Sequence, residues 1–144
     1  MDLQAELTKI IKGDVDASDS AREFYSHDAS IFELKPQIIV FPKSADDIKA
    51  LVKFASAHKK DILNLSLTAR SRGTDMSGGA INDSIIIDTS KYMTKLLDVS
   101  ATQATVQPGM MYKDFEVETL KFGSIMPSYP ASRDLAGMGG LVNN

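Results

Sequence analysis

A short polar stretch, Ala69–Ala80, separates two apolar runs and constrains the fold of this 144-residue chain more than any other segment. The run Ile62–Leu67 leads into it, and the run Ile85–Ile87 leads out of it. Short apolar runs of this kind are typical of buried strands. Glycines in the connecting loop allow a positive φ and a close approach to a ligand, and consecutive N–H groups form an anion-binding concavity. The stretch, called here the glycine loop, predicts a phosphate cradle; a tight turn with glycines needed only for steric reasons is the alternative.

The glycine spacing differs from that of two common nucleotide-binding loops. No Lys-Ser or Lys-Thr pair follows the glycines, as a P-loop requires, and Gly73, Gly78 and Gly79 do not form G-x-G-x-x-G. Both of those motifs also open a helix, whereas an apolar strand is expected after this loop. A phosphate site here would therefore have to be built differently.

The first half of the chain predicts helices and strands in alternation. Helices are expected over residues 2–12 and about 18–25, with a turn at 14–19 between them. Ile38–Phe41 predicts a strand, and Ser44 can cap the helix that follows.

That helix carries apolar residues at helical spacing, namely Ile48, Leu51, Val52 and Ala55. With the next strand expected over 62–67, the order strand, helix, strand predicts a right-handed parallel βαβ unit. The glycine loop would then lie beyond the carboxyl end of a strand, where α/β sheets usually bind ligands.

The second half predicts a strand over 84–88, a hairpin from 96–99 and 104–107, and a helix from Tyr112 that ends near Gly123. The remaining stretch, Pro127–Asn144, is small, glycine-bearing and read as a second loop, called here the C-terminal segment; a plain connection to the next element is the alternative.

Composition excludes several classes of site. A formal net charge of −3 argues against a nucleic-acid partner held by a basic surface. The chain has no cysteine and only two histidines, so thiolate sites and multi-histidine metal sites are not expected. No signal peptide or membrane-spanning stretch is evident, so we expect a cytoplasmic location and leave peripheral membrane association open. The ending Gly139–Asn144 has no cap or stop signal, which predicts a boundary inside a larger protein.

Four motifs in order resemble one family, the FAD-linked oxidases of the vanillyl-alcohol oxidase or p-cresol methylhydroxylase (PCMH) type. The similarity is greatest to the branch of the glycolate oxidase large subunit and D-lactate dehydrogenase. The motifs are Tyr25–Ser30 with Pro36–Ser44, then Arg70–Gly79, then Val106–Gly109, and finally Pro130–Ser132 with Gly139-Gly140 and Asn143-Asn144.

The resemblance implies an α+β fold, the N-terminal subdomain of a PCMH-type FAD-binding domain with a βαβ unit and a small mixed sheet, truncated. Residues 1–30 would form a helical lead-in, and residues 31–144 would form an incomplete FAD-binding domain. FAD would be bound non-covalently. By position, the implied FAD-binding residues are Ser71, Arg72, Gly73, Thr74, Asp75, Ser77, Gly78, Gly79, Ala80, Ser132, Gly139 and Gly140.

Three residues depart from the family pattern in ways that matter for the site. Ser71 replaces a glycine, and Arg72 places a charge where the family often has a small residue. Asp75 puts a negative charge beside the expected pyrophosphate, which is unfavourable unless its side chain points away or caps a backbone N–H.

The resemblance implies part of an FAD-dependent oxidoreductase that oxidises a small 2-hydroxy acid such as D-lactate or glycolate. No catalytic residue is identified, because the family's substrate domain lies outside this sequence. Two alternatives stay open: a non-catalytic nucleotide- or anion-binding module, and an FAD-dependent reductase of the cell-wall-precursor type.

Overall fold

A four-stranded sheet in the order β1-β2-β4-β3 organises the first half of the chain in the computed structural model, which describes residues 2–143. Strands β2 (Ile38–Phe41), β4 (Ile85–Asp88) and β3 (Leu67–Arg70) are parallel, and β1 (Asp14–Asp16) pairs with β2 in the antiparallel sense. The sheet is therefore mixed, as expected. The β2–helix–β3 crossover is present, but β4 lies between its two strands.

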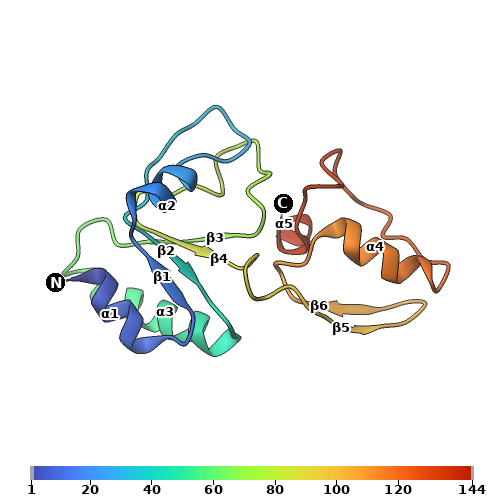
Figure 1. Cartoon of the computed structure of the whole chain (residues 1–144), viewed down its shortest axis with the longest axis horizontal. Helices are drawn as coiled ribbons and strands as arrows, with labels where there is room; N and C mark the ends of the chain where they lie inside the picture. The colour runs from blue at the N-terminus through green and yellow to red at the C-terminus, as the bar shows by residue number, and fades with distance from the viewer. Residues whose placement is uncertain (1, 144) are drawn as a thin grey trace.

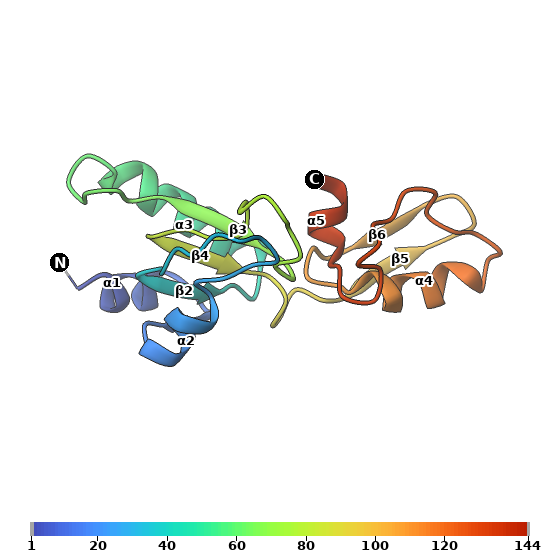
Figure 2. The same ribbon diagram turned by 90° about the horizontal axis from the view of Figure 1, so that it is seen from above.

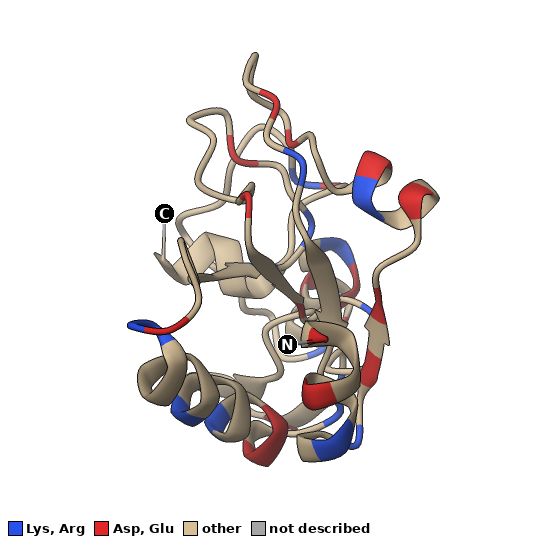
Figure 3. Cartoon of the chain, turned by 90° about the vertical axis from the view of Figure 1, so that its left-hand side faces the viewer, with Lys and Arg blue, Asp and Glu red and all other residues tan. Residues whose placement is uncertain are grey.

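Two helices cover one face of this sheet and bury its core. Helices α1 (Leu3–Ile10) and α3 (Ala45–His58) lie below the strands in Figure 1, whereas α2 (Asp19–Phe24) lies above them. Side chains from α1, α3, β2 and β4 form the core cluster: Leu7, Ile11, Ile38, Val40, Leu51, Phe54, Ile85 and Ile87. Figure 3 shows acidic and basic residues intermixed on the outer surfaces of the helices at this end of the molecule.

The cap expected at the third helix is present, and the first helix is capped in the same way. Asp2 accepts a hydrogen bond from the N–H of Ala5, and Ser44 accepts one from the N–H of Asp47. The Asp47 carboxylate is buried and accepts from the N–H groups of Lys12 and Lys43, so it ties the start of α3 to the chain just before β1 and just after β2. Side-chain caps satisfy N–H groups that a helix start leaves free.

The strand expected over 62–67 is wrong in position, because β3 begins only at Leu67. Residues 62–65 form a turn in which Asn64 has a φ of +59° and Leu63 is 85% exposed. Asparagine tolerates this left-handed conformation better than most residues, so it suits the turn between α3 and β3. The apolar run therefore marked a turn followed by a strand.

The turn expected at 14–19 is also wrong, because residues 14–16 form the edge strand β1. Two of its three residues are aspartates, which are uncommon in strands, so the sequence did not predict a strand here. The third residue, Val15, packs against the core. Gly13 precedes it, and a Cβ at Gly13 would collide with the carbonyl oxygen of Phe41. Helix α1 correspondingly ends at Ile10, before the residue 12 that we expected.

The buried face of α3 differs from the expected one. Leu51 is fully buried, but Val52 is 53% exposed, and Phe54 takes the second core position. The pattern of apolar residues allowed two neighbouring faces, and packing against α1 and the sheet selected the one that contains Phe54.

The second half of the chain forms a separate lobe beside the sheet (Figures 1 and 2). The hairpin of β5 (Leu96–Val99) and β6 (Ala104–Val106) and the helix α4 (Tyr112–Leu120) confirm the expected elements. Buried Met110, Tyr112, Phe115 and Met138 form its core.

The C-terminal segment ends in a helix, which corrects its reading as a loop. Helix α5 (Met138–Asn143) contains Gly139 and Gly140 and lies at the junction of the two lobes in both views (Figures 1 and 2). The N–H of Leu141 donates to the carbonyl of Gly137, which closes its first turn. Asn144 of the family motif lies outside the described residues. None of the described helices has both the length and the apolarity needed to cross a bilayer.

Candidate functional site

A cavity of about 940 Å³ lies between the glycine loop and the C-terminal segment. It is lined by every expected FAD-binding residue except Gly78: Ser71, Arg72, Gly73, Thr74, Asp75, Ser77, Gly79, Ala80, Ser132, Gly139 and Gly140. Two segments that are more than fifty residues apart in the sequence thus form opposite walls of one site. Gly78 is not part of the lining, and a Cβ added there would lie 3.0 Å from the ring of Phe32.

The glycine loop begins where β3 ends and returns to the start of β4, so it lies at the carboxyl end of a parallel strand as expected. Gly73 and Gly78 have φ values of +65° and +85°. L-residues rarely adopt this conformation, whereas glycine does so without steric cost. The glycines are therefore required for the loop's path.

The Asp75 carboxylate is turned into its own loop. It accepts hydrogen bonds from the N–H of Ser77 at 3.0 Å, the N–H of Gly79 at 2.8 Å and the hydroxyl of Ser77 at 2.9 Å. These hydrogen bonds lower the pKa of Asp75, which keeps it ionised. Its charge is thus compensated by the loop itself. The N–H groups of Ser77 and Gly79 are consequently occupied by Asp75.

A different part of the loop offers free donors. Among the described residues, the N–H groups of Arg72, Gly73, Thr74 and Asp75 have no hydrogen-bond acceptor. The Arg72 guanidinium is likewise without an ion-pair partner in the described part of the chain. Four consecutive N–H groups and one cation at a cavity wall form the type of concavity that binds anions.

Arg70, which sequence reasoning did not assign a role, lies at the cavity wall but is only 8% exposed. Its Nη1 donates to the carbonyl of His27 at 2.7 Å and to that of Ala80 at 3.4 Å. Burial lowers the pKa of Arg70 from its ordinary value, and the neighbouring Tyr25 and Asp88 oppose that shift. Its Nη1 is thus directed into the protein, toward these two carbonyls.

The two walls meet at Pro108. Its carbonyl accepts the hydroxyl of Ser71 at 2.8 Å and the N–H of Gly139 at 2.8 Å. Gly137 lies so close to the glycine loop that a Cβ there would collide with Ser71 Oγ and approach Arg72 Cγ. The N–H of Gly139 is therefore used to hold α5 in place, which sequence reasoning could not show.

The C-terminal segment is fixed to α4 by a polar and aromatic cluster that we did not predict. The buried Glu116 carboxylate pairs with Arg133 and accepts the hydroxyl of Tyr112 at 3.0 Å. The hydrogen bond from Arg133 lowers the pKa of Glu116. Tyr129 stacks on Tyr112 with 5.4 Å between ring centroids and lines the cavity. A cluster of this kind holds Tyr129 and its neighbours at the cavity wall.

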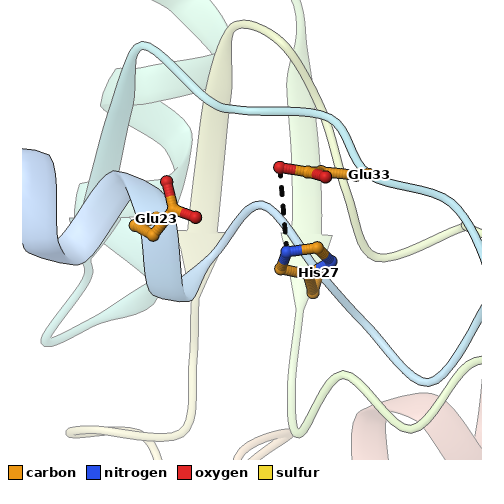
Figure 4. Close-up of side chains that lie close together, drawn as sticks. All are labelled: Glu23, His27 and Glu33. Carbon is orange, nitrogen blue, oxygen red and sulfur yellow. Dashed lines mark ion pairs between the residues drawn. The ribbon is translucent and has the colours of Figure 1, made fainter.

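One group of ligand-type side chains lies outside the cavity, around His27 (Figure 4). His27 Nε2 lies 3.8 Å from Glu33 Oε1, and Glu23 is close by. All three side chains are exposed, and Lys35 Nζ already pairs with Glu23 at 3.2 Å. The group is accounted for as a surface ion-pair cluster, which contributes little to stability.

Comparison with known proteins identifies the family. The sequence pattern of the family described as "FAD binding domain" matches residues 36–144. The chain is 28% identical over 133 residues to D-2-hydroxyglutarate dehydrogenase of Escherichia coli (strain K12), covering 91% of this chain and 13% of that protein. It is 27% identical over 132 residues to glycolate oxidase subunit GlcD of Bacillus subtilis (strain 168), covering 89% of this chain and 27% of that subunit.

The fold matches that of p-cresol methylhydroxylase, with a TM-score of 0.74 at 18% identity, over 93% of this chain and 27% of that one. This match confirms the α+β PCMH-type fold expected from the sequence.

Proposed function

We propose that this chain, which belongs to the FAD binding domain family, binds the pyrophosphate of FAD between the glycine loop and the C-terminal segment. The single observation that supports this most is at residues 72–75, which line the cavity and whose N–H groups have no acceptor among the described residues. The Arg72 guanidinium adds a positive charge at the same wall. A pyrophosphate would satisfy both.

The other wall of the cavity is also suited to close contact with a ligand. It contributes Tyr129, Ser132 and the small residues Gly137 and Gly140, which permit close approach. The chemistry that FAD supplies when bound is hydride transfer. The residues of this chain would bind and orient the cofactor, and no side chain in the cavity is assigned to proton transfer.

We further propose that the whole protein oxidises a small 2-hydroxy acid. This rests on the names of the two relatives, a D-2-hydroxyglutarate dehydrogenase and a glycolate oxidase subunit. The chain spans only 13% and 27% of their lengths, so substrate and electron acceptor are outside what its residues can specify.

FAD binding is tested by titrating the chain with FAD and following the quenching of flavin fluorescence. Replacing Arg72 with glutamine should raise the Kd for FAD about tenfold, because one charge-assisted contact to phosphate is lost. Riboflavin, which lacks the pyrophosphate, should be unaffected by this change. Lys53→Gln is the matched control, since Lys53 is an exposed lysine of α3 outside the cavity.

An unchanged affinity for FAD in Arg72→Gln, or equal losses in both variants, would contradict the proposed site. For the second proposal, the full gene product is mixed anaerobically with D-lactate, glycolate or D-2-hydroxyglutarate, and bleaching of the flavin absorbance is recorded. No bleaching with any 2-hydroxy acid would refute the substrate class while leaving the FAD site intact.

A further inference from the structure

Residues 27–29, which precede the matched family domain, are hydrogen-bonded to the glycine loop. The N–H of Ala29 donates to the carbonyl of Gly73 at 3.1 Å, and the N–H of Ala80 donates to Asp28 Oδ2 at 3.4 Å. The Arg70 guanidinium connects the same two parts, because it donates to the carbonyls of both His27 and Ala80. The segment is thus bonded near the start and at the end of the loop.

This contact is itself anchored in the sheet. The Arg70 guanidinium lies 5.0 Å from the centroid of the Tyr25 ring, and the Tyr25 hydroxyl donates to Asp88 Oδ2 at 2.6 Å. Asp88 is the last residue of β4 and is 3% exposed. Tyr25 therefore connects the segment to the carboxyl end of β4.

The anchoring residues are separate from those that face the ligand. Tyr25, His27, Asp28 and Ala29 do not line the cavity, and the matched family domain begins only at residue 36. Arg70 does reach the wall, but it is mostly buried and its Nη1 is directed into the protein. The contribution of the other four residues to binding can therefore only be indirect.

We propose that Tyr25–Ala29 together with Arg70 form a positioning element, here called the loop bracket, that sets the shape of the phosphate-binding loop without contacting the cofactor. The proposal rests on the proposed FAD site. It assigns a role in cofactor binding to a segment in front of the family domain, and it makes Arg70 a positioning residue and not a phosphate ligand.

Asp28 gives the sharpest test, because positioning and electrostatics predict opposite signs. Removing a negative charge near a site for pyrophosphate should tighten binding if only charge matters. If Asp28 instead holds the end of the loop through Ala80, Asp28→Ala should raise the Kd for FAD about tenfold. Asp28→Asn keeps an oxygen acceptor and should recover most of the affinity.

Asp83→Ala is the matched control. Asp83 is exposed, lies between the same loop and β4, and is outside the cavity and the bracket. Its replacement removes the same charge and should leave the Kd for FAD unchanged or slightly lower. Arg70→Lys provides a second variant: it keeps the charge but cannot reproduce the guanidinium contacts to two carbonyls and the Tyr25 ring, so it should also weaken FAD binding.

Amide hydrogen exchange of the ligand-free chain provides a readout that does not depend on FAD. Asp28→Ala should speed exchange at Ala29 and Ala80 about tenfold while the amides of β2 and β4 keep their rates. Unchanged exchange at those two amides, or unchanged or tighter FAD binding in Asp28→Ala, overturns the bracket. If the unaltered chain does not bind FAD but the exchange difference is present, the proposed FAD site fails, and with it the bracket's role in cofactor binding, while its effect on the shape of the loop is supported.

Discussion

Replacing Gly73 with alanine should destabilise the chain through two separable effects. The residue has a φ of +65°, which costs an L-residue about 1 kcal/mol. A Cβ there would also collide with the buried guanidinium of Arg70, which donates to two backbone carbonyls. Displacing a charged donor from such contacts costs about 2 kcal/mol. We therefore expect Gly73→Ala to lower the free energy of unfolding by about 3 kcal/mol.

Gly123 provides a control that isolates the second effect. Its φ is +69°, but no other heavy atom lies within 4 Å of the position its Cβ would take. Gly123→Ala should thus cost about 1 kcal/mol, from the backbone alone. The assay is urea-induced unfolding of each variant, followed by circular dichroism, with the slope against urea checked for constancy. Equal losses in the two variants would refute the idea that Arg70 fills the space beside Gly73.

Further predictions concern the junction of the lobes and two titrating groups. Gly137→Ala should lower the free energy of unfolding by about 2 kcal/mol by crowding Ser71 Oγ, and adding Ser71→Gly should restore part of it; additive losses in urea unfolding would contradict the contact. Hydrogen bonds, chiefly from Lys91, lower the pKa of Asp14 to about 2, so its stabilising effect should be present above the unfolded pKa of about 3.9 and be lost as the pH falls toward 2. An NMR titration that gave Asp14 an ordinary pKa would contradict this. Burial, more than any other cause, raises the pKa of Tyr25, so stability should fall as the pH rises above about 10, where the unfolded chain ionises. In alkaline melts, Tyr25→Phe should show a shallower decline.

Local signals in the sequence predicted those parts of the fold that depend on neighbouring residues. The Ser44 cap, the hairpin and the apolar strand β4 follow from spacing within a few residues. Even the orientation of Asp75 had a local signal, since an aspartate two residues before Ser77 commonly bonds the backbone ahead of it. The sequence predicted both segments that line the cavity for the same reason, because each contains a short motif of glycines and small residues that can be recognised from neighbouring positions alone.

What the sequence could not predict depends on contacts between distant residues. Strand β1 forms by pairing with β2 and by packing Val15 against the core, and Asp14 also contacts Lys91 and Tyr92 more than seventy residues away. Arg70 looked like any basic residue after a strand, and its inward direction is decided by Tyr25 and His27. Neither partner is recognisable from spacing, because each contact exists only after the sheet has formed.

The width of the cavity is set at Pro108-Gly109 more than by either glycine-bearing wall. The Pro108 carbonyl has two lone pairs, and Ser71 from the first wall and Gly139 from the second each donate to it. Gly109 fixes the same point to the sheet lobe, because its N–H donates to the carbonyl of Met93 and a Cβ there would collide with the carbonyl of Thr89. A displacement of one wall must therefore either move the other or break a hydrogen bond to a shared acceptor. It follows that the two halves of the proposed FAD site are coupled through a dipeptide that the sequence marked as part of a family motif but to which it assigned no role in the site.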